Sequence, residues 1–206
     1  MKNNYINKRL YNLIIGLVIL YGIGIIPVAY KFIDYYKNIP ILILGIVYLI
    51  LIFIGIKISF DYYNSILGQF IGYNFICIPM GMLLSILINI YDINILLETS
   101  IITIIITISM IILSLIFDQF FLKIGNILFN SLVAIIIINI IFTILHINTD
   151  IISWISSFIF ALYIGHDFKK SQDDEFTIPN AIRHGSDFYL DLVNLFINIL
   201  DILDDN

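Results

Sequence analysis

The chain has 206 residues, of which 61% are hydrophobic and only 12% are charged, and its formal net charge is −5. With a mean hydropathy of +1.04, it cannot cover a fold of this length with a water-soluble surface, so the bilayer must act as its solvent. The acidic balance and the absence of a basic patch with interleaved aromatic residues are unlike a nucleic-acid-binding protein.

Apolar segments long enough to cross a hydrocarbon core of about 30 Å recur along the chain. Ile and Val dominate them, but runs of this length without turn residues favour helices in lipid over strands. We expect an all-α polytopic membrane protein with transmembrane helices at about 12–30, 39–58, 65–90, 94–117, 124–146, 151–165 and 187–203. Because most connections are short, sequential helices should be antiparallel neighbours in one domain covering residues 1–206. The charged segment 167–186 is predicted to be a soluble cytoplasmic loop.

Lysine and arginine residues predict the orientation of these helices. If the amino terminus is cytoplasmic, all ten Lys and Arg residues except Lys31 and Lys37 lie on the inner side, as the positive-inside rule requires. The abundance of Ile, Asn, Tyr and Lys suits an AT-rich genome, which favours a bacterial cell membrane. Seven full spans would place the carboxyl terminus outside, whereas a re-entrant last helix would keep it inside.

Motifs of hydrolases and nucleotide-binding proteins are missing. The sequence has no H-E-x-x-H, G-x-S-x-G or P-loop motif, and its three histidines lack the spacing typical of metal ligands. Cys77 is the only cysteine, so it can form no intrachain disulfide and no pair of thiolate ligands. We therefore expect neither enzymatic activity nor a soluble cofactor.

The last predicted helix carries a polar stripe along one face. Polar residues recur in steps of four and three, at Asp187, Asp191, Asn194, Asn198, Asp201 and Asp205. The residues between them are apolar, so the other face suits lipid or packed protein. Asp187, Asn194 and Asn198 are candidates for pore lining, although the two asparagines could equally hydrogen-bond to neighbouring helices. Asp201 and Asp205, near the terminus, are expected to be solvated.

Asp191 is the carboxylate predicted to lie deepest in the bilayer. An ionised Asp at a helix centre costs about 2.5 to 3.5 kcal/mol on insertion scales, so it should face the bundle interior, water or a partner. Its expected partner is Asp167, at the cytoplasmic end of the preceding helix. Two carboxyl groups in contact would share one proton, which ties the helices together, and would form an oxygen-rich calcium site when that proton leaves. The alternatives are that Asp191 serves packing alone and that Asp167 is solvated beside Lys169 and Lys170.

Two segments carry a resemblance to a known family. Phe188-Tyr189-Leu190-Asp191-Leu192-Val193-Asn194-Leu195-Phe196, preceded by Tyr163-Ile164-Gly165-His166-Asp167, resembles the carboxyl-terminal signature of the Bax-inhibitor (transmembrane Bax-inhibitor motif) family. The match covers about residues 161–203. The resemblance implies seven helices with the last at the centre of the other six, and a pH-sensitive calcium leak. It also implies that Asp167 and Asp191 form the proton-sharing and calcium-binding pair.

Lys57 and Glu98 are two further candidate site residues, and each has an alternative structural interpretation. Lys57 lies near the position where bacterial relatives carry an Arg proposed to interact with the carboxyl pair, but a lysine offers a point charge rather than a bidentate fork. It could instead be a snorkelling residue of the inner interface. Glu98, near the outer end of the fourth span, is either an outer cation site or an interfacial residue.

These observations favour a passive calcium conduit gated by protonation of the pair, with the calcium ion and membrane lipid as its partners. The acidic residues Asp173, Asp174 and Glu175 could raise the local cation concentration at the inner mouth, or could simply be solvated. One alternative is a regulatory protein that binds a membrane partner, such as a membrane-anchored protease. Another is a proton-coupled transporter of small solutes.

Overall fold

The computed structural model describes residues 5–145 and 150–204, which divide into two compact units. Unit 1 comprises Met1–Tyr91 and Asp174–Leu190, and unit 2 comprises Asp92–Asp173 and Asp191–Asn206. Asp205, expected to be solvated, lies outside the described residues.

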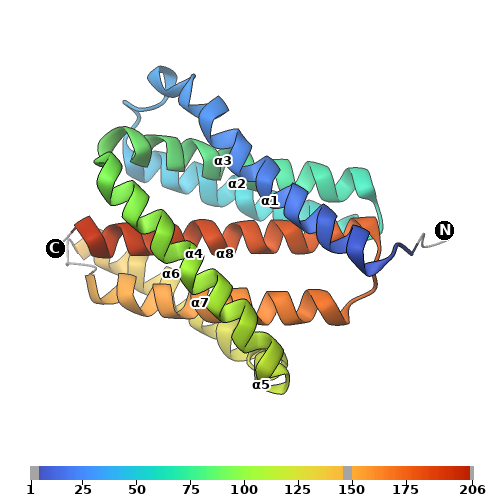
Figure 1. The fold of residues 1–206 in the computed structure, drawn as a ribbon. Coiled ribbons are helices and arrows are strands. Elements are labelled where there is room, and N and C mark those ends of the chain that lie inside the picture. The colour runs from blue at the N-terminus through green and yellow to red at the C-terminus, as the bar shows by residue number, and fades with distance from the viewer. Residues whose placement is uncertain (1–4, 146–149, 205–206) are drawn as a thin grey trace. The chain divides into compact units, whose positions relative to one another are not determined.

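Helices account for nearly all of the described chain (Figure 1). The helices that lie wholly in unit 1 are α1 (Lys8–Tyr30), the 3-10 helix η1 (Ile33–Tyr35), α2 (Ile41–Asp61) and α3 (Ile66–Ile90). Those of unit 2 are α4 (Ile93–Ile116), α5 (Asp118–Lys123), α6 (Gly125–Leu145) and α7 (Asp150–Asp173). The last helix, α8 (Ile178–Asp204), contributes its first part to unit 1 and, from Asp191, its remainder to unit 2. Across residues 5–145 and 150–204 there is no strand apart from an isolated bridge between Tyr5 and Thr177, so the prediction of an all-helical fold is confirmed.

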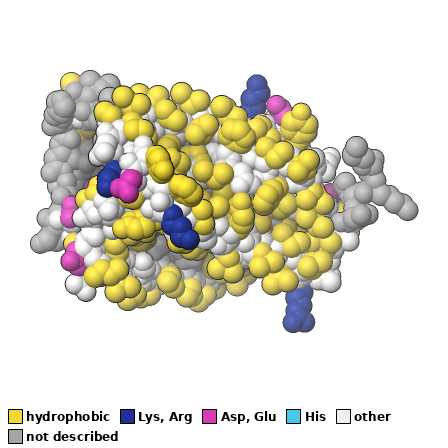
Figure 2. Space-filling view, turned by 90° about the horizontal axis from the view of Figure 1, so that it is seen from above, with side chains coloured by type: hydrophobic (Ala, Val, Ile, Leu, Met, Phe, Trp, Pro, Cys, Tyr) yellow, Lys and Arg dark blue, Asp and Glu magenta, His cyan; other side chains and the backbone are white. Residues whose placement is uncertain are grey.

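Six helices in the described ranges are long and apolar enough to cross a membrane. They are Lys8–Tyr30, Ile43–Asp61, Ile66–Ile90, Ile93–Ile116, Gly125–Phe142 and Ile151–Asp173. Hydrophobic side chains predominate on the face seen in Figure 2, as expected for a surface in contact with lipid. The chain is thus a multi-pass membrane protein. The polar stripe lowers the hydropathy of α8, and full spanning by that helix stays a prediction.

Unit 1 is built around α3, which packs against both α1 and α2. The α2–α3 contact depends on glycines, because a Cβ added at Gly55 would lie only 2.6 Å from the carbonyl oxygen of Gly72. Small residues of this kind allow membrane helices to approach backbone to backbone. On the α1 side, the buried Tyr73 hydroxyl donates to the carbonyl oxygen of Val18 at 2.7 Å.

Unit 2 is built around α7, which packs against α4, α5 and α6. Phe121, Ile124 and Leu128 form a buried cluster where the chain turns from α5 into α6. The start of α7 is joined to the end of α8, because the Ser153 hydroxyl donates a hydrogen bond to Asp201. Asp201 is half-buried rather than solvated, so the expectation for this residue was wrong.

The predicted cytoplasmic loop 167–186 is helical at both ends. α7 continues to Asp173 and α8 begins at Ile178, which leaves residues 174–177 as the connection. High charge suggested a loop, but charged residues also stabilise helix ends, and the Lys169 ammonium lies 3.0 Å from the Asp173 carboxylate one turn later. Thr177 caps α8, since its hydroxyl oxygen accepts from the backbone N–H of Asn180 at 3.3 Å.

Candidate functional site: a buried carboxyl pair

Asp167 and Asp191 lie together in unit 2. Asp167 projects from the last two turns of α7 and Asp191 from the middle of α8, and they are only 9% and 6% exposed. A side-chain hydrogen bond joins their carboxyl groups. Two carboxyl groups that share a hydrogen bond in a buried place cannot both be ionised cheaply, so the contact requires a shared proton or a cation. Their roles in pH sensing and calcium binding stay predictions.

The turn of α7 that carries Asp167 is held by the α5–α6 corner. The imidazole Nδ1 of His166 lies 2.6 Å from the carbonyl oxygen of Phe121, which can only accept, so Nδ1 carries the proton. The other ring nitrogen, Nε2, lies 3.8 Å from the Asp167 carboxyl. Added Cβ atoms would collide with the His166 ring at Gly125 and with the Phe121 ring at Gly165.

Sequence reasoning missed this support for the carboxyl pair. Gly125 lies 41 residues before His166, and nothing in the local pattern links the two. The available signal was glycine at both positions, because small residues allow membrane helices to approach closely.

The surroundings of Asp167 differ from the predicted solvated environment. Lys170 is exposed and acts electrostatically on Asp167, whereas Lys169 is directed to Asp173 at 3.0 Å and to Asp118 at 4.0 Å. The alternative that Asp167 is solvated beside these lysines is wrong, because the carboxyl is buried.

The other predicted site residues lie in varied positions. Asn194 and Asn198 are half-buried in unit 2, where the Asn198 side-chain amide donates to the backbone carbonyl of Asn194 at 2.7 Å. Asp187 is half-buried in unit 1. Lys57 on α2 and Glu98 on α4 are exposed, and both interpretations of each residue stay predictions. Lys57 belongs to unit 1, so an interaction with the carboxyl pair stays a prediction.

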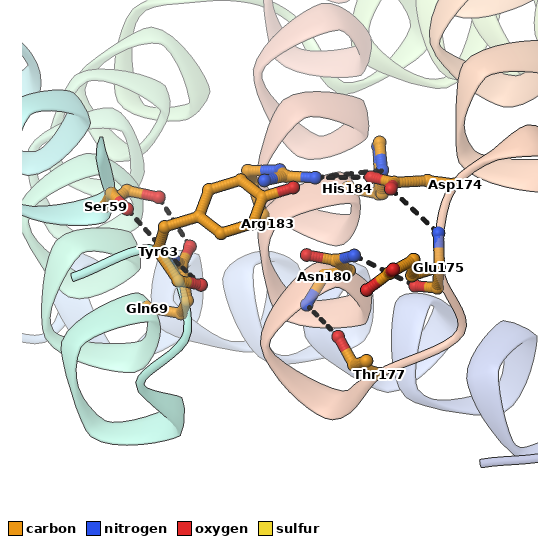
Figure 3. Close-up of polar contacts among 9 residues, drawn as sticks. All are labelled: Ser59, Tyr63, Gln69, Asp174, Glu175, Thr177, Asn180, Arg183 and His184. Atoms are coloured by element: carbon orange, nitrogen blue, oxygen red, sulfur yellow. Dashed lines mark hydrogen bonds and ion pairs between the residues drawn. The ribbon is translucent and has the colours of Figure 1, made fainter. Parts of the chain in front are cut away.

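A second polar cluster, in unit 1, surrounds the connection between α7 and α8 (Figure 3). The Asp174 carboxylate accepts from Arg183 at 2.5 Å and from His184 Nε2 at 2.9 Å. The Arg183 guanidinium also lies 4.2 Å from the centre of the Tyr63 ring, a cation–π contact. Acidic residues of this segment were predicted to be solvated or to attract cations, but Asp174 is engaged within the protein.

Burial and these contacts shift the pKa values of both titratable partners. Burial by itself would raise the pKa of Asp174, but hydrogen bonds from His184 and the Glu175 backbone, with the charge of Arg183, hold it below its usual range. Burial is the largest influence on His184 and lowers its pKa, against the opposing effects of Asp187 and Asp174. Asp174 is therefore ionised and His184 neutral at pH 7.

The amino-terminal segment covers this connection. The Ile6 backbone N–H donates to the carbonyl oxygen of Phe176 at 2.8 Å, and the Tyr5 hydroxyl donates to the Glu175 carboxylate at 3.2 Å. The ring of Tyr11 packs on that of Phe176 with centroids 4.9 Å apart. Residues 174–177 are thus held from two sides within unit 1.

Two comparisons with known proteins bear on the identity of this chain. A family model described as "Inhibitor of apoptosis-promoting Bax1" matches residues 2–206. No curated protein matches the sequence significantly. The family match covers nearly the whole chain, far beyond the carboxyl-terminal segments that carry the resemblance in sequence. This multi-pass helical membrane protein therefore belongs to the Bax inhibitor family.

Proposed function

We propose that the protein is a pH-sensitive calcium-leak channel in which Asp167 and Asp191 form the gate. The observation that carries the proposal is the hydrogen bond between these two buried carboxyl groups, one on α7 and one on α8. The activity is passive conduction, without covalent chemistry or a resident cofactor. It operates in a bacterial plasma membrane, with the amino terminus in the cytoplasm.

The gate works through a single proton. When one carboxyl is protonated, its O–H donates to the other and ties α7 to α8. When the proton leaves, two negative charges repel one another in a poorly solvated place, and that contact breaks. Calcium flux therefore rises as the pH rises through the apparent titration of the pair.

The same residues suit calcium as the conducted ion. Ca²⁺ takes six to eight oxygen ligands, and two carboxylates supply at most about four, so the ion keeps part of its water shell. Asn194 and Asn198 follow Asp191 at helical spacing of three and seven residues, which continues the polar face along α8. Since the Asn198 amide donates to the backbone, its carbonyl oxygen is the atom suited to a cation.

The proposal includes seven transmembrane helices, with α8 surrounded by the six candidate spans α1, α2, α3, α4, α6 and α7. Support comes from burial, because every residue of α8 from Ile178 to Leu203 is buried or half-buried. Such a helix, with its polar stripe, needs partners on all sides. It would then line the path of the ion.

Calcium flux into dye-loaded proteoliposomes, measured from about pH 5 to pH 8, tests this proposal. We expect pH-dependent flux for the wild type and a flat, low flux for Asp191→Asn, because the amide keeps a neutral hydrogen bond to Asp167. Asp173→Asn, which changes an exposed carboxylate of the same helix as Asp167, is the matched control and should retain the wild-type pH profile.

A folded protein without calcium flux at any pH would overturn the channel proposal and would favour a regulatory membrane protein instead. In that case co-purification of a membrane partner becomes the decisive experiment. Saturable uptake of a solute, in place of an ion leak, would favour the transporter.

A further inference from the structure

Unit 2 has an apolar groove between α4, α5 and α7. Its volume is about 390 Å³, within the range of ligand sites in proteins. The lining residues are all apolar and include Leu113, Phe120, Phe121, Phe158 and Leu162. A lining of this kind offers no hydrogen bond to a polar ligand.

The position of the groove indicates what covers it. α4 and α7 are candidate membrane spans, and α5 joins α4 to α6. The groove is lined by the carboxyl end of α4, by α5 and by the middle of α7, so it extends from the turn at α5 along the apolar surface of the spans. Its rim is open, since the side chains of Phe158 and Phe120 are 67% and 51% exposed. Hydrocarbon chains of the bilayer are the apolar groups that meet this surface.

One exposed lysine is on the same helix face as a rim residue of the groove. Lys123 is exposed and follows Phe120 by three residues, so the two side chains share a face of α5. Lys169, also near α5, is directed to Asp118 and Asp173. No ion pair of Lys123 is found within the two described ranges. Its ammonium group is therefore available to pair with an anion.

We propose that this groove binds one acyl chain of an anionic phospholipid, whose phosphate pairs with Lys123. The acyl chain fills the apolar lining and the headgroup stays at the level of α5, which matches the order of groups in a lipid molecule. Snorkelling of Lys123 toward the headgroups follows the same geometry. A single lysine near an anionic membrane surface strengthens binding by roughly fivefold.

The site has a structural connection to the carboxyl pair. Phe121 lines the groove, and its ring packs against Gly165, which has no side chain. The carbonyl oxygen of Phe121 accepts a hydrogen bond from Nδ1 of His166. A lipid in the groove thus supports the corner that holds the turn before Asp167. The binding site itself does not depend on the proposed channel function.

Quenching of a tryptophan by brominated lipids tests the site. The chain has one tryptophan, Trp154, which lies one turn before Phe158 on α7. The double variant Trp154→Phe/Phe158→Trp moves this reporter into the groove lining. In phosphatidylcholine bilayers containing a minor fraction of brominated lipid, we expect brominated phosphatidylglycerol to quench it with about fivefold higher apparent affinity than brominated phosphatidylcholine.

Two lysine variants of the reporter protein separate a specific site from general lipid contact. Lys123→Gln should abolish the preference for phosphatidylglycerol, whereas Lys31→Gln, which changes an exposed lysine at the end of α1 in unit 1, should preserve it. Circular dichroism and gel filtration establish that each variant is folded. Equal quenching by the two brominated lipids, or an unchanged preference in Lys123→Gln, would overturn the proposal.

Discussion

Gly165 shows how a single residue shapes the site. A Cβ at this position would collide with the ring of Phe121, a buried side chain that would have to shift. The absence of a side chain here lets α7 approach the α5–α6 corner closely enough for His166 to reach the Phe121 carbonyl. The position of His166, the neighbour of Asp167, thus depends on the glycine that directly precedes it.

Gly165→Ala should therefore destabilise the protein by about 1 to 3 kcal/mol, the cost of overpacking a well-packed interior. Thermal unfolding in detergent micelles would measure the change. Gly24→Ala is the matched control, because no atom lies within 4 Å of a Cβ built there and alanine favours the helix. Equal melting temperatures for Gly165→Ala and wild type would contradict the close contact.

At the scale of elements, the α7–α8 connection depends on an ion pair and a buried imidazole. Asp174 should contribute roughly 1.5 to 3 kcal/mol at pH 7 through its charged hydrogen bonds. Asp174→Asn should lower the stability of the protein by this amount, measured by unfolding in detergent. Asp173→Asn, one residue earlier but more exposed, should cost less than about 1 kcal/mol.

The pH dependence of this contact follows from the direction of each pKa shift. The folded pKa of Asp174 is lowered, so its contribution is present above the unfolded value of about 3.9 and is lost as the pH falls through the lower folded value. The folded pKa of His184 is also lowered, so protonation favours unfolding once the pH falls below about 6.5. Wild-type stability should decline in both windows.

Variants can assign the two windows to the two residues. Unfolding of Asp174→Asn from about pH 3 to pH 7 should lack the decline below about pH 4, while His184→Gln should lack the decline that starts near pH 6.5. Identical pH profiles for both variants and wild type would show that the shifts of Asp174 and His184 do not control acid stability.

For the whole molecule, the decisive question is whether α8 crosses the membrane. Seven spans place its end on the side opposite to the end of α7. We expect Asp204→Cys to react with a membrane-impermeant maleimide in intact cells, and Asp173→Cys to react only in inside-out vesicles. Cys77 is fully buried and should not compete for the reagent. Labelling of both positions from the same side would indicate a re-entrant α8.

Much of the fold could be predicted from sequence, because a transmembrane helix requires about 20 consecutive apolar residues, and such a segment is a local property of the sequence. Five of the six candidate spans begin and end within four residues of the expected bounds, whereas the last extends to Asp173 instead of 165. Helix ends were less predictable where polar residues replace apolar ones. The α7 end at Asp173 and the α8 start at Ile178 are stabilised by the Lys169–Asp173 pair and the Thr177 cap, and composition alone suggested a loop there.

The sequence by itself determined the membrane class, the approximate spans and the polar stripe of α8, since each depends on composition or on periodicity within one segment. The sequence also predicted Asp167 as the partner of Asp191, but only the tertiary structure decided between that pairing and a solvated Asp167. Only the tertiary structure decided that Asp201 accepts from Ser153 and that Asp174 is held by Arg183 and His184. These contacts join residues that lie between 9 and 48 positions apart. Which of them meet depends on how helices pack, and helix packing is set by shape complementarity between distant segments that no local pattern records.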